Sequence, residues 1–339
     1  MASSIGLSQF VVGGVTAPLN LDHVDGKFRS HGLYLSTSKI QTDPERRYAM
    51  VYWLMANPKA GEKDSRGAEF WRNYLESAGI VDIRDCSLDD KSWTEEVGPR
   101  DFILAAGGDG SVNAAAGFCL DAGATLAVLP SGTANDFARN LGLPDDPQHI
   151  CNLISAGRTR MLDVAATENG LFLNVAHIGL GTLPVRESSA DAKRLLGRFS
   201  YGVALLQKLR VNRGFHGLIE TEKGTVAGRW LTIAVSSGAF FGGGNEIPQA
   251  SAGDGQLDVV AVRPRSLLQL FIAFLTVRLS RHSPKRTSTV VHLKSPTVSI
   301  TTRSRRTVTM DGDIAGHTPL RARCRPACLK VICEELVTT

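Results

Sequence analysis

Three short apolar runs in the first half of the chain each end in a turn rich in glycine, proline or asparagine. The runs cover residues 49–56, 102–106 and 124–129, and their length is typical of strands rather than of buried helices. Apolar residues with helical spacing occupy residues 68–78, and Ser111 is predicted to cap a second helix after the second run. Strands that alternate with helices in this way predict a parallel α/β sheet.

The second half of the chain has a different pattern, because short β-branched runs follow one another directly. These runs are residues 171–175, 217–220, 230–235, 257–262, 289–292, 297–301 and 306–310. Two helical stretches, residues 195–209 and 266–279, interrupt the series. Many short strands in series predict an antiparallel β-sandwich.

The length of 339 residues is sufficient for two domains with separate cores. We therefore expect an α/β domain over residues 48–163 and a β-sandwich domain over residues 164–339, with the boundary near Asp163. One alternative is that the C-terminal end returns to the first domain. Residues 1–47 form an N-terminal extension whose role the sequence does not define.

Polar turns follow the three early strands, where a parallel sheet binds its ligands. Glycine allows backbone N–H groups to close around phosphate oxygens, and the N-terminus of the next helix favours negative charge. Asp109 fits beside a polyphosphate only if a Mg²⁺ ion or a shared water lies between them. Neither a G-x-x-x-x-G-K-[ST] loop nor a G-x-G-x-x-G fingerprint occurs, so ordinary P-loop and Rossmann sites lack support.

These turns carry a resemblance to a known family. Gly107 to Ser111 resembles the GGDGT element of diacylglycerol, sphingoid-base and NAD kinases. Asn57 to Gly61 resembles the lipid-kinase NPxSG turn, and Pro130 to Arg139 resembles the P-x-G-T-x-N-D-F-A-R element, which is the most specific match. The later motifs at 254–258 (DGQLD) and 310–313 (MDGD) resemble stretches of the diacylglycerol kinase catalytic-domain family.

The resemblance extends from about Tyr48 to Val331 and implies both a fold and an activity. The implied fold joins a parallel α/β domain of NAD-kinase/6-phosphofructokinase-like type to a C-terminal antiparallel β-sandwich. The implied activity is transfer of the γ-phosphate of ATP, with Mg²⁺, to a hydroxyl of a diacylglycerol, ceramide or sphingoid-base lipid. The residues implied to bind ATP are Asn57, Pro58, Lys59, Ala60, Gly61, Gly107, Gly108, Asp109, Gly110, Ser111, Asn113, Gly132, Thr133, Asn135 and Asp136.

The resemblance also assigns roles to three carboxylates. Asp313 is implied as the base that takes the proton from the substrate hydroxyl, and Asp163 as a residue that orients or supports it. Asp109 is implied as the neighbour of the catalytic Mg²⁺. A separate metal ion, structural in this family, is implied at Ser251, through its carbonyl oxygen, with Asp254 and Gln256.

The chain departs from the family pattern on both sides of the implied site. Ala60 lacks the usual serine hydroxyl, which removes one hydrogen bond to phosphate. Asp313 is one methylene shorter than the glutamate often found there, which moves the base back by ~1 Å unless the backbone compensates. The substrate geometry is therefore less well predicted than the ATP site.

The charge pattern favours an anionic partner, with a formal net charge of +5. Lys and Arg recur from Arg263 to Arg306 without any Asp or Glu, as either a solvated face or a surface for anionic lipid headgroups. The apolar stretches at 195–209 and 266–282 are expected either to pack on the sandwich or to contact lipid. No run reaches the ~18 apolar residues of a membrane span, so we expect a cytoplasmic enzyme that associates peripherally with membranes.

Other functions remain as alternatives to a lipid kinase. A kinase of the same fold acting on a non-lipid alcohol such as NAD is disfavoured by the lipid-type element at Pro130 to Arg139. A binding module without activity is disfavoured because both Asp109 and Asp313 are present. Nucleic-acid binding is not expected, since the basic segment lacks interleaved aromatic residues. The six cysteines are expected to be free thiols, and the sequence leaves a homodimer open.

Overall fold

The computed structural model describes nine stretches of the chain. They are residues 22–24, 27–29, 50–56, 66–179, 214–241, 245–247, 250–266, 269–270 and 289–334. The chain divides into two units, residues 1–49 and residues 50–339. In the first unit, β1 (Asp22–Val24) and β2 (Lys27–Arg29) form an antiparallel hairpin of their own.

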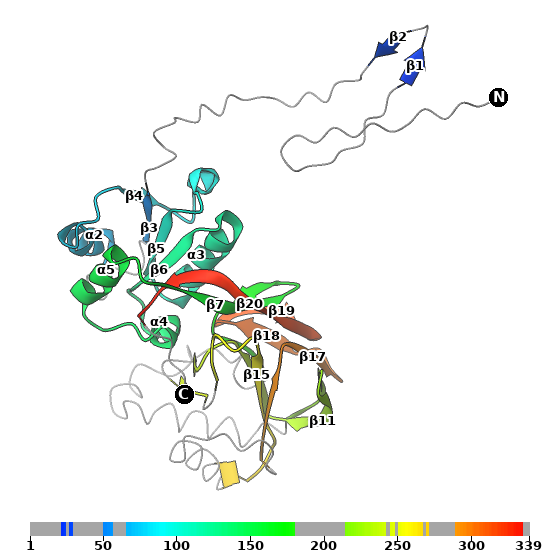
Figure 1. Cartoon of the computed structure of the whole chain (residues 1–339). Coiled ribbons are helices and arrows are strands. Elements are labelled where there is room, and N and C mark those ends of the chain that lie inside the picture. Colours follow the sequence, from blue (N-terminus) through cyan, green and yellow to red (C-terminus); the bar gives the residue numbers. More distant parts are fainter. Residues whose placement is uncertain are drawn as a thin grey trace. The chain divides into compact units, whose positions relative to one another are not determined.

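The second unit begins with a parallel sheet (Figure 1). Strands β3 (Tyr52–Ala56), β5 (Phe102–Gly107) and β6 (Thr125–Pro130) run parallel to one another, and β4 (Ile83–Cys86) pairs with β3 at the edge. β5 is buried along its whole length and β6 in all but its last residue, Pro130. Continuous apolar strands of this kind are typical of a parallel sheet that is covered on both faces.

Helices cover both faces of this sheet. α2 (Ala68–Ser77) and α5 (Pro147–Ser155) pack on one face. α3 (Asp109–Ala122), the 3₁₀ turn η2 (Ser92–Glu96) and the short α4 (Asp136–Asn140) contribute to the core on the other face. Alternate residues along each strand point to opposite faces, so the sheet lies between two separate apolar cores.

Local signals account for where these helices begin and end, with one correction. Gly108 is the N-cap of α3, so the predicted capping role of Ser111 is wrong, and Ser111 is buried in the first turn instead. The helix starts earlier because the extended backbone of Gly108 already turns into it. α3 ends at Gly123, whose φ of 70° is left-handed. Before α5, the Asp146 carboxylate accepts a hydrogen bond from the N–H of His149 (3.1 Å), as an N-cap should.

A single long strand joins the parallel sheet to the second half of the chain. β20 (Leu320–Ile332) runs parallel to β6 at its end, where Val331 lies opposite Leu126. It also pairs antiparallel with β7 (Thr159–Thr167) over most of its length. The start of β20 pairs with β17, which leads to the strands beyond it. In order away from β20, the strands on this side are β17 (Thr297–Thr302), β10 (Phe215–Thr221) and β11 (Gly224–Trp230). The short strand β8 (Gly170–Phe172) pairs with β7.

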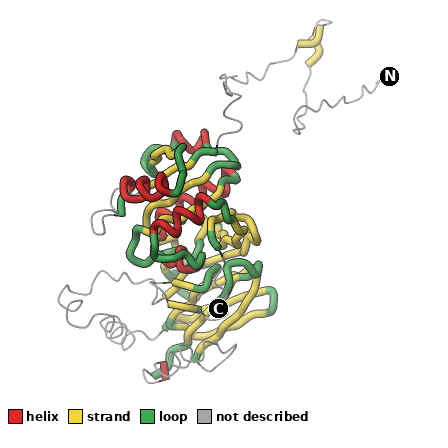
Figure 2. Tube along the Cα trace, turned by 60° about the vertical axis from the view of Figure 1, so that its left-hand side comes forward, coloured by secondary structure: helices red, strands yellow, loops and turns green. Residues whose placement is uncertain are grey.

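A second, antiparallel sheet packs against this one. In spatial order its strands are β16 (Val290–Ser295), β15 (Leu257–Val262), β12 (Thr232–Ser236), β9 (Val175–Gly179), β18 (Thr307–Met310) and β19 (Asp313–His317). The apolar core between the two sheets includes Phe172, Trp230 and Ile300. Figure 2 shows helices around the parallel sheet and strands throughout the rest of the second unit. The predicted α/β domain with an antiparallel β-sandwich is therefore confirmed.

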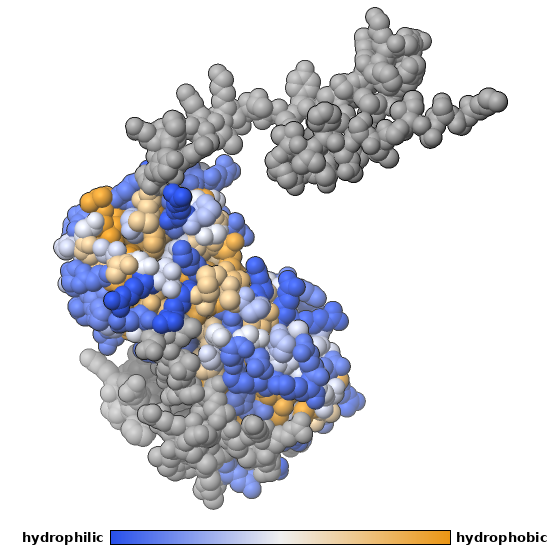
Figure 3. All heavy atoms as spheres, in the orientation of Figure 1, coloured by the Kyte–Doolittle hydropathy of each residue, from blue (hydrophilic) through white to orange (hydrophobic). Residues whose placement is uncertain are grey.

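The surface of the described residues is mainly polar on the face drawn in Figure 3, with smaller hydrophobic areas between. None of the helices in the described stretches has the length and apolar character that crossing a bilayer requires. The cysteines form no disulfide, and Cys119 and Cys151 are buried. The predictions for residues 57–61, 195–209 and 271–282 lie outside the described residues.

Candidate functional site

The turns that follow β5 and β6 touch each other at two glycines. A methyl group built on Gly132 would lie 2.5 Å from Cα of Gly108 and 3.2 Å from its nitrogen. The N–H of Ser131 donates to the carbonyl oxygen of Gly107 (3.1 Å), which continues the pairing of the two strands into the turns. A side chain at Gly132 would separate the turns, so glycine is required for this approach.

The second turn is fixed by its own asparagine. Asn135 has a left-handed backbone with φ of 50°, and its side-chain oxygen accepts from the N–H of Gly132 (3.0 Å). Its amide nitrogen donates to the Gly132 carbonyl (2.8 Å). Trp71 of α2 donates from its indole to the hydroxyl of Ser131 (2.8 Å), and Thr133 remains exposed at the tip. Hydrogen bonds within the turn and from Trp71 therefore fix its backbone, while Thr133 stays accessible to solvent.

Asp109, the first residue of α3, connects that helix to α4. Its carboxylate accepts hydrogen bonds from the N–H groups of Phe137 (3.0 Å) and Asp136 (3.3 Å). It also accepts one from the side chain of Asn174 (3.3 Å). Because three donors already point at this carboxylate, Asp109 holds the predicted site together whatever its chemical role.

Asn174 was not identified from the sequence, although it lies at the centre of the network. Its side-chain oxygen accepts from the amide of Asn140 (2.9 Å) while its nitrogen donates to Asp109, and the residue is buried. The available signal was an asparagine inside the apolar run 171–175, an unfavourable residue for a strand. The run is in fact divided, because β8 ends at Phe172 and β9 begins at Val175.

Asp311 explains that division and is the second residue missed as a site residue. Its carboxylate accepts hydrogen bonds from the N–H groups of Leu173 (2.8 Å), Asn174 (2.9 Å) and Val175 (2.9 Å). It also accepts from the side chain of Asn113 on α3 (2.8 Å). These N–H groups would otherwise have paired with a neighbouring strand. Asp311 therefore joins the β18–β19 turn of the sandwich to helix α3.

The surroundings of the Asp311 carboxyl group shift its pKa through two opposing effects. As a whole residue Asp311 is half-buried, but its carboxylate points towards the four donors. Burial raises the pKa of this carboxyl, and the hydrogen bonds act in the opposite direction. The donors therefore offset the cost of removing a charged group from water.

Asp313 lies two residues further along the same turn and has the opposite character. It is exposed, and a methyl group built on Gly110 would lie 3.8 Å from its Oδ2 atom. The carboxylate is thus placed beside the glycine turn at the N-terminus of α3. The structure thus places Asp313 beside Gly110, the second residue of α3, and the role of this carboxylate as a base stays a prediction.

Asp163 lies in a different set of contacts. Its carboxylate accepts hydrogen bonds from the N–H groups of Gly255 (2.6 Å) and Ala327 (2.8 Å), and the residue is buried in β7. These bonds connect β7 to the DGQLD turn and to an irregularity in β20. The residue predicted to support Asp313 therefore acts on the turn that contains Asp254.

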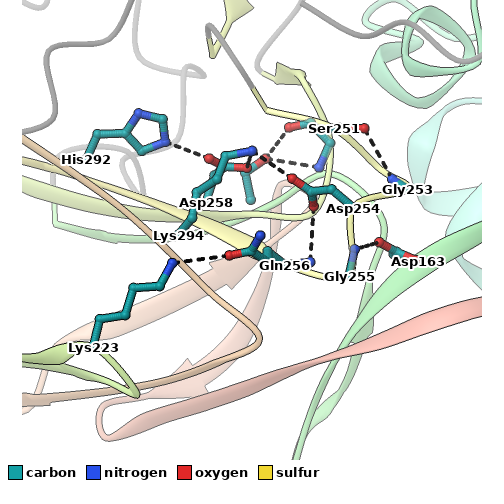
Figure 4. A network of polar contacts seen from close by, with 12 residues as sticks. Asp163, Lys223, Ser251, Gly253, Asp254, Gly255, Gln256, Asp258, His292 and Lys294 are labelled. Atoms are coloured by element: carbon teal, nitrogen blue, oxygen red, sulfur yellow. Dashed lines mark hydrogen bonds and ion pairs between the residues drawn. The ribbon is translucent and has the colours of Figure 1, made fainter.

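The residues predicted to hold a structural metal already contact cations of the protein (Figure 4). Asp254 Oδ2 lies 2.7 Å from the ammonium group of Lys294, and Gln256 Oε1 accepts from Lys223 (3.5 Å). The hydroxyl of Ser251 accepts from the N–H of Gly253 (3.4 Å). In the described part of the chain, no group of three or more His, Cys, Asp or Glu residues is arranged to hold a metal ion. The side chains of Asp254 and Gln256 are thus each engaged by an ammonium group of the protein.

Replacing Asp311 by asparagine should destabilise the protein. The new NH₂ group cannot accept hydrogen bonds, so two of the four donors lose their partner, and we expect a loss of about 2–3 kcal/mol in the free energy of unfolding. Denaturant unfolding of Asp311→Asn and of Asp313→Asn measures it. Asp313→Asn is the matched control because the exposed residue should change stability by less than about 0.5 kcal/mol. Equal stability of the two variants would contradict the role given to Asp311.

Gly132→Ala should also destabilise the protein, because the added methyl group meets backbone rather than a flexible side chain. We expect a loss of about 1–3 kcal/mol in the free energy of unfolding. Gly117→Ala is the control, since a methyl group there meets nothing within 4 Å and lies inside helix α3. Gly117→Ala should stabilise the protein by about 0.5–1 kcal/mol. If the Gly132→Ala variant were as stable as the Gly117→Ala variant, the close contact between Gly132 and Gly108 would be disproved.

Comparison with known proteins places this site in a family. Residues 51–167 match the model of the diacylglycerol kinase catalytic domain, and residues 177–333 match the YegS C-terminal NAD kinase beta sandwich-like domain. A Cronobacter sakazakii protein named "Probable lipid kinase YegS-like" is 30% identical over 67% of this chain and 76% of its own. An uncharacterized protein of Synechocystis is also 30% identical, over 68% of this chain, which spans 54% of that protein.

A solved structure has the same fold. The crystal structure of a diacylglycerol kinase from Bacillus anthracis superimposes with a TM-score of 0.64 at 22% identity. The match covers 85% of this chain and 98% of that one. Two consecutive domain models and a relative aligned over three quarters of its length agree with the motifs read from the sequence. The chain belongs to the diacylglycerol kinase catalytic-domain family of lipid kinases.

Proposed function

We propose that the protein transfers the γ-phosphate of ATP to a hydroxyl group of a lipid of the diacylglycerol, ceramide or sphingoid-base type. The observation that carries the proposal is the position of Asp313, an exposed carboxylate beside Gly110 at the N-terminus of α3. A proton acceptor and a candidate phosphate-binding turn therefore face each other. Phosphoryl transfer to an alcohol needs both parts on opposite sides of the transferred group.

The phosphates of ATP would bind at the turns after β5 and β6. Gly107, Gly108 and Gly110 precede or begin α3, a helix of 14 residues whose N-terminus favours negative charge. Exposed Thr133 lies on the neighbouring turn, which the contact between Gly132 and Gly108 holds in place. Residues 57–61, which follow β3 in the sequence, belong to the proposed ATP site through the family resemblance alone.

The residues present fit a Mg²⁺ ion that is held mainly by phosphate oxygens and water. Asp109 accepts three hydrogen bonds, which leaves about one acceptor position of a carboxylate unused. Asp313 is exposed on the other side of Gly110. Magnesium keeps several of its waters and takes one or two carboxylates in such sites. When bound with ATP, the ion would neutralise charge on the transferred phosphate.

On the acceptor side, Asp313 would accept the proton of the lipid hydroxyl as the new P–O bond forms. A hydroxyl group is a weak nucleophile, so a positioned carboxylate contributes by removing its proton during transfer. The position of this carboxylate depends on Asp311, two residues earlier in the same turn, which is bound to α3 through Asn113. Most of the rate would come from alignment of the alcohol with the phosphate.

Asp313→Asn should abolish transfer while leaving the fold intact, because it removes the proton acceptor from an exposed position. We expect a fall in kcat of at least about 100-fold. The assay supplies Mg²⁺-ATP and mixed micelles of diacylglycerol, ceramide, sphingoid base or monoacylglycerol, with NAD as a non-lipid acceptor. The control is Asp313→Glu, which restores the carboxylate on a longer chain and should retain activity.

Retained activity in Asp313→Asn would reject the base assignment. Labelling of NAD, with no label in any lipid, would instead reject the lipid as acceptor and favour the same-fold kinase of a small alcohol. The two results separate the identity of the base from the identity of the substrate.

We also propose that one end of the sandwich contacts anionic lipid headgroups. Arg263 lies over the ring of Trp230 (5.0 Å to the centroid), and Arg306 over that of Phe215 (5.3 Å). Phe215 and Trp230 are opposite each other in the β10–β11 ladder. The next pair along this ladder is His216 and Arg229. The arginines of three separate segments thus meet at one end.

The same end carries further arginines in the part of the chain that the structure describes. A surface hollow of about 570 Å³ is lined by Arg229, Pro264, Arg265, Ser266 and Gln269. The N–H of Arg303 donates to the carbonyl of His216 (3.1 Å), which adds the segment after β17. The described strand ends here contain no Asp or Glu; they are residues 214–217, 228–232, 260–266, 289–292 and 301–308. A surface rich in arginine attracts the anionic headgroups among which a lipid substrate lies.

Charge reversal at this end should weaken binding to anionic membranes. We expect Arg303→Glu with Arg305→Glu to reduce binding to phosphatidylglycerol-containing vesicles by at least about tenfold, with no effect on pure phosphatidylcholine vesicles. Sedimentation with vesicles measures it. Arg323→Glu with Lys330→Glu makes the same charge change on exposed positions of β20, where Arg323 lies opposite the far end of β17. A similar loss in both double variants, or tighter binding of the wild type to nucleic acid than to vesicles, would reject this surface.

A further inference from the structure

We infer that the ammonium group of Lys294 takes the place of the structural divalent cation that the DGQLD turn was predicted to bind. In this role, the positive charge of the Lys294 side chain holds the DGQLD turn to strand β16. It concerns the fold of the sandwich and is independent of the proposed phosphoryl transfer. Three features of the contacts in Figure 4 carry it.

The first feature is the register of the sheet. Asp258 of β15 and Lys294 of β16 lie directly opposite each other in the antiparallel ladder. Their side chains leave the same face of the sheet, so the ammonium group meets the carboxylate without any special loop (3.6 Å to Oδ2). The same nitrogen lies 2.7 Å from Oδ2 of Asp254 in the turn before β15. One ammonium group therefore bridges two carboxylates, as a metal ion would.

The second feature is the burial of Asp258. Only 1% of this residue is exposed, so its charge needs a partner close by. The other carboxylate oxygen lies 2.6 Å from Nε2 of His292, which is also buried. His292 lies two residues before Lys294 on the same strand and so points to the same face. The carboxylate has an imidazole on one side and an ammonium group on the other.

The third feature is that the side chains of two predicted ligands, Asp254 and Gln256, are already engaged. Oδ1 of Asp254 accepts from the N–H of Gln256 (3.1 Å), which closes the turn on itself. The side-chain oxygen of Gln256 faces a second ammonium group, that of Lys223 (3.5 Å). A divalent cation among these oxygens would lie next to two positive charges, and like charges at such distances repel strongly. An ammonium group suits the site, whereas Ca²⁺ or Mg²⁺ would first have to displace Lys294.

The turn is thereby fixed from two sides without a metal ion. Lys294 holds Asp254 to β15 and β16, and Asp163 on β7 accepts from the N–H of Gly255 (2.6 Å). The second carboxylate oxygen of Asp163 binds the N–H of Ala327 in β20. The two sheets are therefore linked through this turn, and the link should not depend on divalent cations.

The experiment compares wild type with Lys294→Met in the absence of nucleotide. In the wild type, the thermal midpoint should be the same with EDTA, Mg²⁺ or Ca²⁺. Lys294→Met leaves two carboxylates without their cation, so its midpoint with EDTA should fall by about 5–15 °C. Adding Ca²⁺ should recover part of that loss, and a second change, Asp254→Asn, should abolish the recovery.

Two controls keep the result interpretable. Lys330→Met removes a lysine from an exposed position of β20 and should change the midpoint little. Lys294→Arg keeps a positive charge and should remain insensitive to metal ions. Elemental analysis of dialysed wild-type protein gives a direct reading that does not require any variant to fold.

Two outcomes would overturn the inference. The first is about one Ca²⁺ or Mg²⁺ per wild-type chain that is lost in Asp254→Asn. The second is a Lys294→Met variant as stable with EDTA as Lys330→Met. Neither outcome depends on phosphoryl transfer, so a failure here and an absence of kinase activity are distinguishable.

Discussion

The candidate site depends on one interaction, the capture of the Asp311 carboxylate by four N–H donors. Three come from consecutive backbone groups between β8 and β9, and the fourth comes from Asn113 on α3. A carboxylate removed from water is stable only with such compensation. The helix that begins with the glycine turn and the hairpin that carries Asp313 thus meet at a shared charge. The relative position of turn and hairpin is set by this requirement and less by general apolar contact.

Asn174 extends the same constraint to the turn that follows β6. Its backbone N–H binds Asp311, and its side chain connects Asp109 with Asn140 on α4. Asp109 in turn receives the first two N–H groups of α4. The segments after β5, after β6 and after β18 are therefore linked by a continuous set of hydrogen bonds. Because buried polar groups must be satisfied together, displacement of one member would leave others unpaired.

The sequence predicts local features of this arrangement well. β5, β6 and α2 appear close to their predicted bounds, because an apolar run with a defined period and a turn at its end is a local property. The start of α3 was misplaced, since the backbone of Gly108 already serves as the cap. The pairing of β20 with β6 and β7 joins segments far apart in the chain, which no local pattern encodes.

Side-chain roles were predictable only as far as the motif determined them. The family motif assigns the base to Asp313, but it gives no sign that Asp311, two residues earlier, is bound by four donors. The contacts of Asp163 were likewise not predictable, because its partners Gly255 and Ala327 lie 92 and 164 residues away.

The contrast among these aspartates indicates how function and stability are divided in the fold. Asp163 and Asp258 are buried, and Asp311 points into a cluster of donors; each is bound to groups of the protein itself. A carboxylate whose acceptor positions are filled can stabilise structure but has little capacity left to take a proton from a substrate. Asp313 is exposed and lies beside the glycine turn, so it has that capacity. Asp311, two residues earlier, fixes the hairpin, so the proposed base at Asp313 would keep a defined position although its side chain is short and exposed.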